Sequence, residues 1–311
     1  MAFDPVSGRI LLFGGTGAGS VNDARNDTWT WDGSTWLELH PATSPPPRLG
    51  ASMTLDSWSG HLLLFGGQAG IGGYFDDTWE WNGSTWELLQ PSGPVPPPRM
   101  GASMTGGFLP VLLFGGEGEN TTFDDTWTWN GPQRKWYRLT PNGSSPVARW
   151  GAAMGTPPPE LNVMFGNPQN LLFGGYTASA AISDTWYWIG TRSTWGEFNP
   201  SSVPLARYCS SMAFDSAANE LVLFGGLASS SNSFFNDTWA WNASASEWEQ
   251  LSPIGAPPPS RCWAAMEFDS ANNCMVLFGG AAAASTLGDT WILDRVSALD
   301  VPFQFPVEFA G

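Results

Sequence analysis

Positive charge is scarce in this 311-residue sequence. Lys135 is the only lysine, and 12 basic residues stand against 28 acidic ones, which gives a formal net charge of −16. A surface this acidic repels phosphate backbones and anionic lipid head groups. Nucleic acids and membrane surfaces are therefore excluded as expected partners.

Long apolar runs and cysteines are scarce as well. No run reaches the about 18 apolar residues of a membrane-spanning helix, so no membrane insertion is expected. The three cysteines, Cys209, Cys262 and Cys274, are too few for a disulfide framework. One bridge is compatible with that count, but each cysteine is interpreted as a small apolar filler. Residues 1–15 lack the basic and long apolar parts of a signal peptide.

Glycine, proline and tryptophan are abundant. The 37 glycines and 26 prolines suit short strands and turns rather than helices, and the 42% of apolar residues suffices for a sizeable core. Two motifs recur. Phe-Gly-Gly, preceded by an aliphatic run, occurs at Phe13, Phe65, Phe114, Phe173, Phe224 and Phe278. Asp-Thr-Trp begins at Asp27, Asp77, Asp125, Asp184, Asp237 and Asp289.

Tryptophan recurs with these motifs, and the Phe-Gly-Gly copies lie 49 to 59 residues apart. A second Trp lies two residues beyond that of Asp-Thr-Trp in five units, and an outer Trp follows it as Trp36, Trp86, Trp136, Trp195 and Trp248. The three columns contain 16 of the 19 tryptophans; Trp58, Trp150 and Trp263 lie outside them. Most indole rings are therefore expected to fill the space between neighbouring repeats.

Each unit reads as four antiparallel strands, the last two joined by a turn such as Asn82-Gly83. Six such units predict an all-β fold, a six-bladed β-propeller with four antiparallel strands per blade. We expect one propeller domain over residues 1–302 and a tail over 303–311 that closes the ring in one interpretation. The approximate blade boundaries are 1–41, 42–91, 92–141, 142–199, 200–252 and 253–302.

The double glycine, the spaced aromatic residues and the Arg that opens each following unit together resemble kelch repeats, of the Trp- and Pro-rich microbial type. The resemblance implies a propeller and a binding role without naming a partner. Some kelch propellers are enzymes, galactose oxidase among them, with a copper site of His and Tyr ligands. Here His40 and His61 occupy unrelated repeat positions, and no partner set of tyrosines stands out. No catalytic residue, metal ligand or cofactor is predicted; a metal-dependent enzyme is the alternative.

An arginine column opens the first strand of units two to six: Arg48, Arg99, Arg149, Arg207 and Arg261. Two interpretations are open. Guanidinium groups near the mouth of a central channel would clamp an anion or carboxylate. Alternatively, each Arg ties blades together through a repeated Asp or backbone carbonyls, and the periodicity favours this structural role.

Aromatic residues beside that column are the other candidate ligand-binding groups. Trp150 and Tyr208 directly follow an arginine, and Trp263 lies one residue further on. Because Trp150 and Trp263 lie outside the structural columns, they are expected to contact a ligand or to plug the channel. The variable loops between second and third strands are expected on the same face.

Three departures from the repeat mark its weak points. Met1 aligns with the middle of a first strand, so either the chain continues upstream or another segment, with 303–309 as the candidate, completes that strand. Ala298 stands where the outer Trp of unit six should be. A Pro-rich insertion, 155–168, lengthens unit four and is either a contact loop or a tolerated surface insertion.

The sequence thus predicts a non-enzymatic module that binds a protein or a glycan, alone or within a larger multidomain or multi-subunit assembly. Adjacent carboxylates at Asp76 and Asp77 raise calcium as a minor alternative. Few charges and six Asn-x-Ser/Thr sites favour an extracellular or cell-surface location, with a cytoplasmic one as the alternative.

Overall fold

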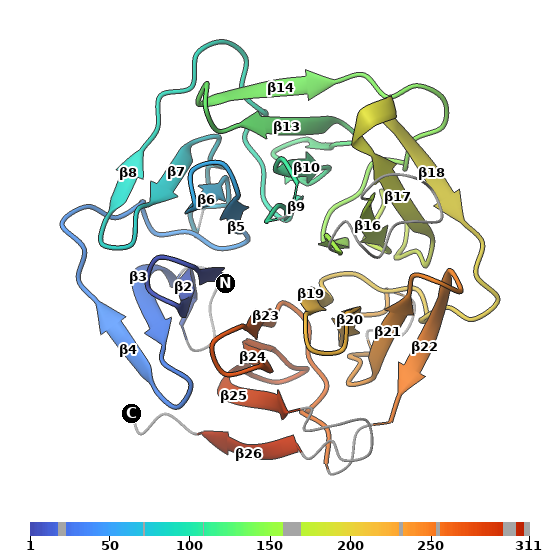
Figure 1. Ribbon diagram of the computed structural model, residues 1–311. Helices are drawn as coiled ribbons and strands as arrows, with labels where there is room; N and C mark the ends of the chain where they lie inside the picture. Colours follow the sequence, from blue (N-terminus) through green and yellow to red (C-terminus); the bar gives the residue numbers. More distant parts are fainter. Residues whose placement is uncertain are drawn as a thin grey trace. The chain divides into compact units, whose positions relative to one another are not determined.

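The computed structural model describes residues 1–17, 23–70, 72–107, 109–157, 169–229, 233–252, 256–294 and 303–307. The chain forms two compact units: Met1–Trp150 with Thr191–Trp195, and Gly151–Gly190 with Gly196–Gly311. Six four-stranded antiparallel sheets follow one another along the chain (Figure 1). The predicted all-β class, six propeller blades of four strands each, is confirmed.

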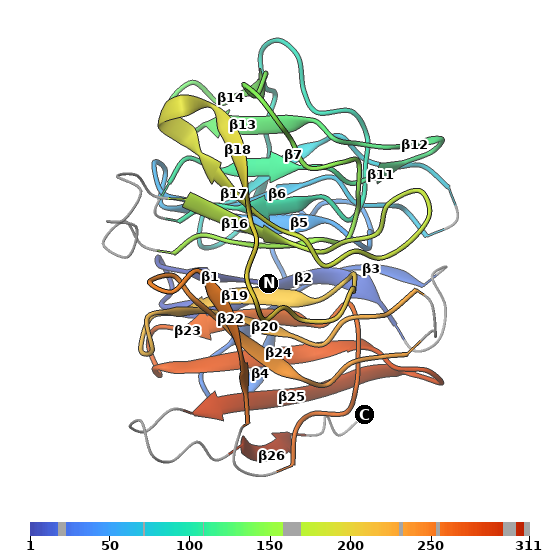
Figure 2. The ribbon, with the colours of Figure 1, turned by 90° about the vertical axis from the view of Figure 1, so that its right-hand side faces the viewer.

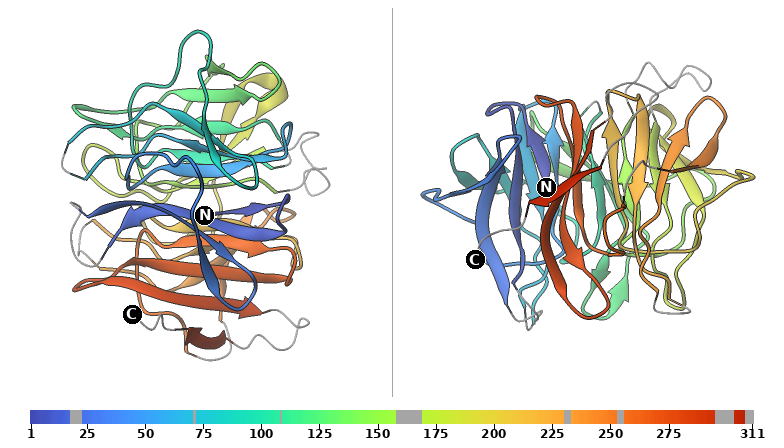
Figure 3. Two further views of the ribbon diagram at one scale, coloured as in Figure 1. Left: turned by 90° about the vertical axis from the view of Figure 1, so that its left-hand side faces the viewer. Right: turned by 90° about the horizontal axis from the view of Figure 1, so that it is seen from below.

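The first three sheets belong to the first unit. They consist of β1 (Ala2–Asp4), β2 (Arg9–Thr16), β3 (Ala24–Trp31) and β4 (Trp36–Leu39); β5 (Ser52–Asp56), β6 (His61–Phe65), β7 (Thr78–Trp81) and β8 (Trp86–Leu88); and β9 (Ser103–Thr105), β10 (Leu112–Phe114), β13 (Thr126–Asn130) and β14 (Lys135–Leu139). A small hairpin, β11 (Glu117–Gly118) and β12 (Thr121–Thr122), extends past the ends of the third sheet (Figure 2). Figure 3 shows how strongly the first sheet, drawn in blue, twists between β2 and β4.

The remaining sheets follow the same order. They consist of β15 (Ala153–Gly155), β16 (Gln169–Phe173), β17 (Thr185–Ile189) and β18 (Thr194–Phe198); β19 (Ser211–Asp215), β20 (Glu220–Phe224), β21 (Thr238–Asn242) and β22 (Glu247–Leu251); and β23 (Ala265–Asp269), β24 (Cys274–Ala281), β25 (Thr286–Asp294) and β26 (Phe303–Val307). In the described residues the helical structure is one 3-10 turn, η2 (Gly190–Arg192), and none of them forms a helix long and apolar enough to cross a membrane.

Apolar side chains of neighbouring sheets form the cores within each unit. Leu63 and Phe65 of β6 pack with Trp129 of β13 and Trp136 of β14 in one such cluster. In the second unit, Leu223 of β20 packs with Leu171 of β16 in the same manner. The expectation that tryptophan rings fill the space between blades is thereby confirmed.

A repeated contact, which we call the tryptophan latch, joins successive blades. The outer Trp of one blade donates its indole N–H to the Thr of Asp-Thr-Trp in the preceding blade, at 3.0 Å each time: Trp86 to Thr28, Trp136 to Thr78, Trp195 to Thr126 and Trp248 to Thr185. The same rings meet the Phe of the preceding Phe-Gly-Gly, with centroids 5.1 to 5.3 Å apart. The latch explains why Phe-Gly-Gly, Asp-Thr-Trp and the outer Trp recur together.

The sixth sheet obtains its outer strand from the C-terminal segment. β26 pairs with β25, whereas β1 pairs with β2, so the expectation that residues 303–309 complete the strand of Met1 is wrong. The sixth blade accordingly extends to Val307 rather than to 302. Phe303 stands opposite Leu293, the register position that Trp86 holds opposite Trp81. Ala298 and residues 158–168 of the insertion lie outside the described residues.

Candidate binding site

The arginine column is buried and fully engaged in pairing. Arg207 donates to both carboxylate oxygens of Asp237 at 2.5 and 2.8 Å, and to the carbonyl oxygens of Gly225 and Leu205. Its guanidinium also lies 3.9 Å from the ring centroid of Phe235. Arg48, Arg99 and Arg261 make the same bidentate pairs with Asp77, Asp125 and Asp289. In these four units the first residue of Asp-Thr-Trp is thus the partner of an arginine.

The backbone of the same arginines holds the preceding blade. Arg99 donates its N–H to the carbonyl of Phe75 at 3.1 Å and accepts from the N–H of Gly67 at 2.8 Å. A Cβ at Gly66 would lie 2.6 Å from the Arg99 carbonyl oxygen, which explains a glycine at this position. Each such arginine therefore links two successive blades, with its side chain in one and its backbone against the other.

This arrangement bears on both interpretations of the column. The paired side chains of Arg48, Arg99, Arg207 and Arg261 are 0% exposed, and Arg149 is equally buried with its Nε on the carbonyl of Val147 at 3.0 Å. An anion clamp needs guanidinium groups that a ligand can reach. The contacts give Arg48, Arg99, Arg207 and Arg261 a structural role. Ligand binding by Arg48, Arg99, Arg149, Arg207 and Arg261 stays a prediction.

Three of the paired aspartates, Asp125, Asp237 and Asp289, have lowered pKa values. Burial opposes the charge on Asp237, but hydrogen bonds from Arg207 and the Arg207 charge outweigh it, so the pKa of Asp237 is lowered. The same balance lowers the pKa values of Asp125 and Asp289. These carboxylates serve the fold and are not poised for acid–base chemistry.

A left-handed backbone position lies two residues beyond each arginine. Gly50, Gly101 and Gly151 occupy it with φ of 63°, 58° and 63°. The last two blades instead place Cys209 (φ 55°) and Trp263 (φ 58°) there, although side chains with a Cβ are disfavoured in this region. Backbone hydrogen bonds fix the conformation, from Trp263 N to Cys209 O at 2.9 Å and from Cys209 N to Gly151 O.

Trp263 is the exposed member of this column. Its side chain is 42% exposed, whereas Cys209 and Cys262 beside it are buried. Tyr208 forms an isolated bridge with Leu227 and packs its ring on Tyr176, with centroids 5.0 Å apart. Burial raises the pKa of Tyr208, with a further contribution from Cys209 and Cys262. The second unit therefore carries the Tyr176–Tyr208 ring pair and the exposed Trp263, whose backbone N–H binds the carbonyl of Cys209, the residue after Tyr208. We call Trp263, Tyr208 and Tyr176 the aromatic site.

Trp150 ends the first unit and is partly buried. Its predicted role in ligand contact stays a prediction.

Comparison with known families explains the shared design of the blades. The sequence matches the KLHDC2/KLHL20/DRC7 Kelch-repeats domain over residues 1–170 and 161–299. The chain belongs to the kelch-repeat family. No curated protein matches the sequence. Kelch-repeat domains are generally interaction scaffolds rather than enzymes, which agrees with a chain whose repeated charges are used for folding.

Other groups in this kelch chain fit the same description. The three cysteines are free and buried, and burial raises the pKa of the Cys262 thiol to about 11. They are small fillers, as predicted, and Cys262 is a poor nucleophile. Asp77, half of the suggested calcium pair, is engaged by Arg48. Within the described ranges no three His, Cys, Asp or Glu side chains are grouped as metal ligands.

Tyr176 and Trp58 were missed by sequence reasoning. Tyr176 directly follows Phe-Gly-Gly, at the start of a segment that reads only as a variable loop in the sequence. Trp58 lies in the turn between β5 and β6, is 65% exposed, and stands where the first blade has Val6. Comparing each residue with its own repeat column, rather than with residues of its type, would have found both.

Proposed function

We propose that this kelch propeller is a non-enzymatic module that binds a peptide segment of a protein partner at the aromatic site. The observation that carries the proposal is Trp263, which exposes a large ring at a strained position that three other blades leave to glycine. Strain of this kind is retained at ligand sites more often than elsewhere. Rigid aromatic side chains are also the commonest anchors of protein interfaces.

A glycan is the second candidate ligand. Tyr176 and Tyr208, with ring centroids 5.0 Å apart, lie in the same unit as the exposed Trp263, and flat rings of this kind also stack on sugars. The extracellular or surface location expected from the sequence suits either ligand and stays a prediction.

Parallel selections test the proposal. The purified chain is screened against a random-peptide display library and a glycan array, and the affinity of each hit is measured for wild type, Trp263→Ala and Trp58→Ala. We expect selected peptides whose affinity falls at least about tenfold in Trp263→Ala, the loss typical of an aromatic anchor, and stays unchanged in Trp58→Ala. Hits confined to the glycan array would identify a sugar, and not a peptide, as the ligand of the aromatic site. The proposal would be overturned if wild type and Trp263→Ala bound the selected peptides with equal affinity.

A further inference from the structure

The third blade holds half of the basic residues of the first unit that lie outside the arginine column. Five of the 12 basic residues form the buried arginine column. Of the other seven, three fall within five positions of one another: Arg134, Lys135 and Arg138. They lie on β14 and on the turn that precedes it. In a chain with a net charge of −16, three of the seven basic residues outside the column thus lie together on one outer strand and its turn.

The repeat shows that the fold does not require these bases. At the position of Arg134 the other blades carry Ser34, Ser84, Ser193 and Ser246. At that of Lys135 they carry Thr35, Thr85, Thr194 and Glu247, and at that of Arg138 they carry Glu38, Leu88, Glu197 and Gln250. Since one architecture is built without them, the three bases have another use in this blade.

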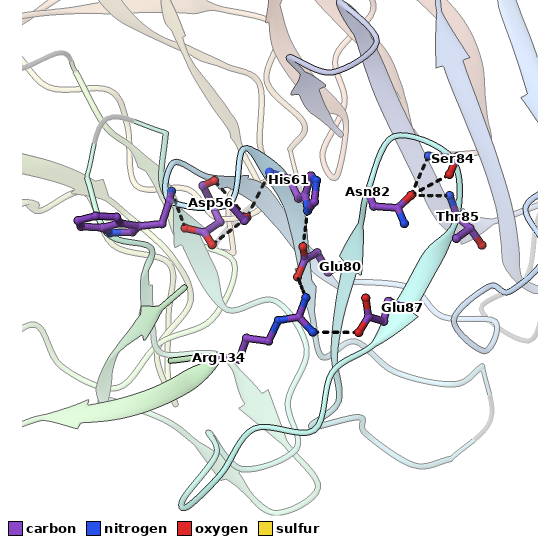
Figure 4. Close-up of polar contacts among 10 residues, drawn as sticks. Asp56, His61, Glu80, Asn82, Ser84, Thr85, Glu87 and Arg134 are labelled. Carbon is purple, nitrogen blue, oxygen red and sulfur yellow. Dashed lines mark hydrogen bonds and ion pairs between the residues drawn. The ribbon is translucent and has the colours of Figure 1, made fainter. Parts of the chain in front are cut away.

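Arg134 reaches away from its own strand toward the second blade (Figure 4). Its guanidinium lies 3.3 Å from Glu80 on β7 and donates to Glu87 on β8 at 2.9 Å. Glu80 also contacts His61 and is nearly buried, whereas the side chains of Arg134 and Glu87 are 51% and 52% exposed. An exposed pair of this kind contributes little stability, so an incoming carboxylate can replace Glu87 at small cost.

The other members of the patch lie along an edge strand. β14 is the last strand in its sheet order, so its outer side is not used by that sheet. Tyr137 is 37% exposed, and the Lys135 ammonium lies 5.0 Å from its ring centroid. Arg138 is exposed. Lys135 and Arg138 lie about 10 Å apart along the extended strand, and Arg134 lies in the turn before it with φ of 47°. We call these four residues, Arg134, Lys135, Tyr137 and Arg138, the β14 strip.

We propose that the β14 strip binds a short acidic peptide segment of a partner protein in extended conformation. Complementary charge selects the acidic side chains, and the strip matches about four extended residues. A long polyanion is disfavoured because the rest of the chain is strongly acidic. Another copy of the chain is disfavoured for the same reason.

The test measures binding of a fluorescein-labelled hexaglutamate peptide by anisotropy at low ionic strength. Arg134→Ser, Lys135→Thr and Arg138→Glu install residues that the same columns hold in other blades, so these variants are expected to fold. Each should weaken binding about two- to fivefold, the range of one exposed ion pair. Glu87→Gln, which removes one of the two internal carboxylates that pair with Arg134, should strengthen binding by a similar factor.

Two controls make the outcome decisive. Arg25→Ser removes an exposed arginine that pairs with Asp23 on the first blade, and it should leave the affinity unchanged. A sulfated oligosaccharide of equal charge should bind more weakly than the peptide. The proposal is overturned if Glu87→Gln and Arg134→Ser leave binding unchanged, if Arg25→Ser weakens it as much, or if the oligosaccharide binds more tightly.

Discussion

At the scale of single residues, the arginine column shows how this fold tolerates buried charge. Arg207 pairs both of its terminal nitrogens with Asp237, and its remaining side-chain hydrogen bonds go to carbonyl oxygens. Removing one partner of such a pair leaves an uncompensated buried charge, which is far more costly than a broken surface pair. The aspartates must therefore stay ionised for the blades to stay joined.

Acid should weaken the protein through these pairs. The folded-state pKa values of Asp125, Asp237 and Asp289 lie below the ordinary value, so their contribution is complete above about pH 4 and is lost as the pH falls through the folded values. The free energy of unfolding, measured with urea between about pH 6 and pH 3, should fall with acidification, and more shallowly in Asp237→Asn. Equal slopes in the two proteins would contradict this account.

The left-handed column makes a second prediction. Gly50 has φ of 63°, and a Cβ there would lie 3.2 Å from the Cβ of Met100. Gly50→Ala should therefore lower the free energy of unfolding by about 1 kcal/mol or more. Gly190→Ala is the matched control, because Gly190 is exposed and its φ is not positive, and it should cost less than about 0.5 kcal/mol. A similar cost for both substitutions would argue against strain in this column.

At the scale of elements, the tryptophan latch fixes the angle between neighbouring blades. Trp136 donates to Thr78 and packs on Phe65, so one side chain closes both a polar and an apolar contact. The fifth blade carries the equivalent hydroxyl on Thr238. Among the described residues no indole donates a hydrogen bond to it. A cavity of about 20 Å³ lies there instead, lined by Thr238, Phe224, Trp291 and Leu293.

Two valine substitutions compare a threonine that accepts an indole hydrogen bond, Thr78, with one that accepts none among the described residues, Thr238. Thr78→Val leaves the buried indole N–H of Trp136 without an acceptor and should cost about 1 to 3 kcal/mol. Thr238→Val removes a hydroxyl that no indole engages within the described part of the chain, and it should change stability by less than about 0.5 kcal/mol. Urea unfolding of both variants checks the difference. Equal losses would show that the indole bond is not what Thr78 supplies.

The sixth blade can be given a latch. Phe303 holds the register position of the outer Trp, opposite Leu293. Phe303→Trp supplies an indole donor at that position and should raise the free energy of unfolding by about 1 kcal/mol. In a Thr238→Val background the gain should shrink, since the acceptor is gone. A loss of stability in Phe303→Trp would mean that the register does not bring the indole to Thr238.

At the scale of the whole chain, the repeat made most of the fold predictable. Because Phe-Gly-Gly and Asp-Thr-Trp each recur six times, strand number, hairpin positions and the packing role of tryptophan follow from the sequence. The origin of the sixth outer strand did not follow. The chain passes Ala298 before it supplies that strand at Phe303, and sequence alone does not say which apolar segment pairs with β25.

The candidate sites were harder to predict than the fold. The arginines attracted attention because they recur, yet recurrence is what a structural pair produces in every blade. Trp263 carried the opposite signal, since it replaces a glycine, but its left-handed backbone is visible only in the structure. Arg134 departs from a serine column in the same way. Function in this chain is therefore expected where one blade differs from its copies.

Trp263→Gly tests that claim most directly, because it restores the residue that Gly50, Gly101 and Gly151 provide. Affinity for a peptide from the display selection and the circular dichroism spectrum are measured on the same preparation, beside wild type and Trp58→Ala. We predict a folded variant with a wild-type spectrum and at least about a tenfold loss of affinity, while Trp58→Ala binds normally. A folded Trp263→Gly variant that binds as tightly as wild type would contradict the account.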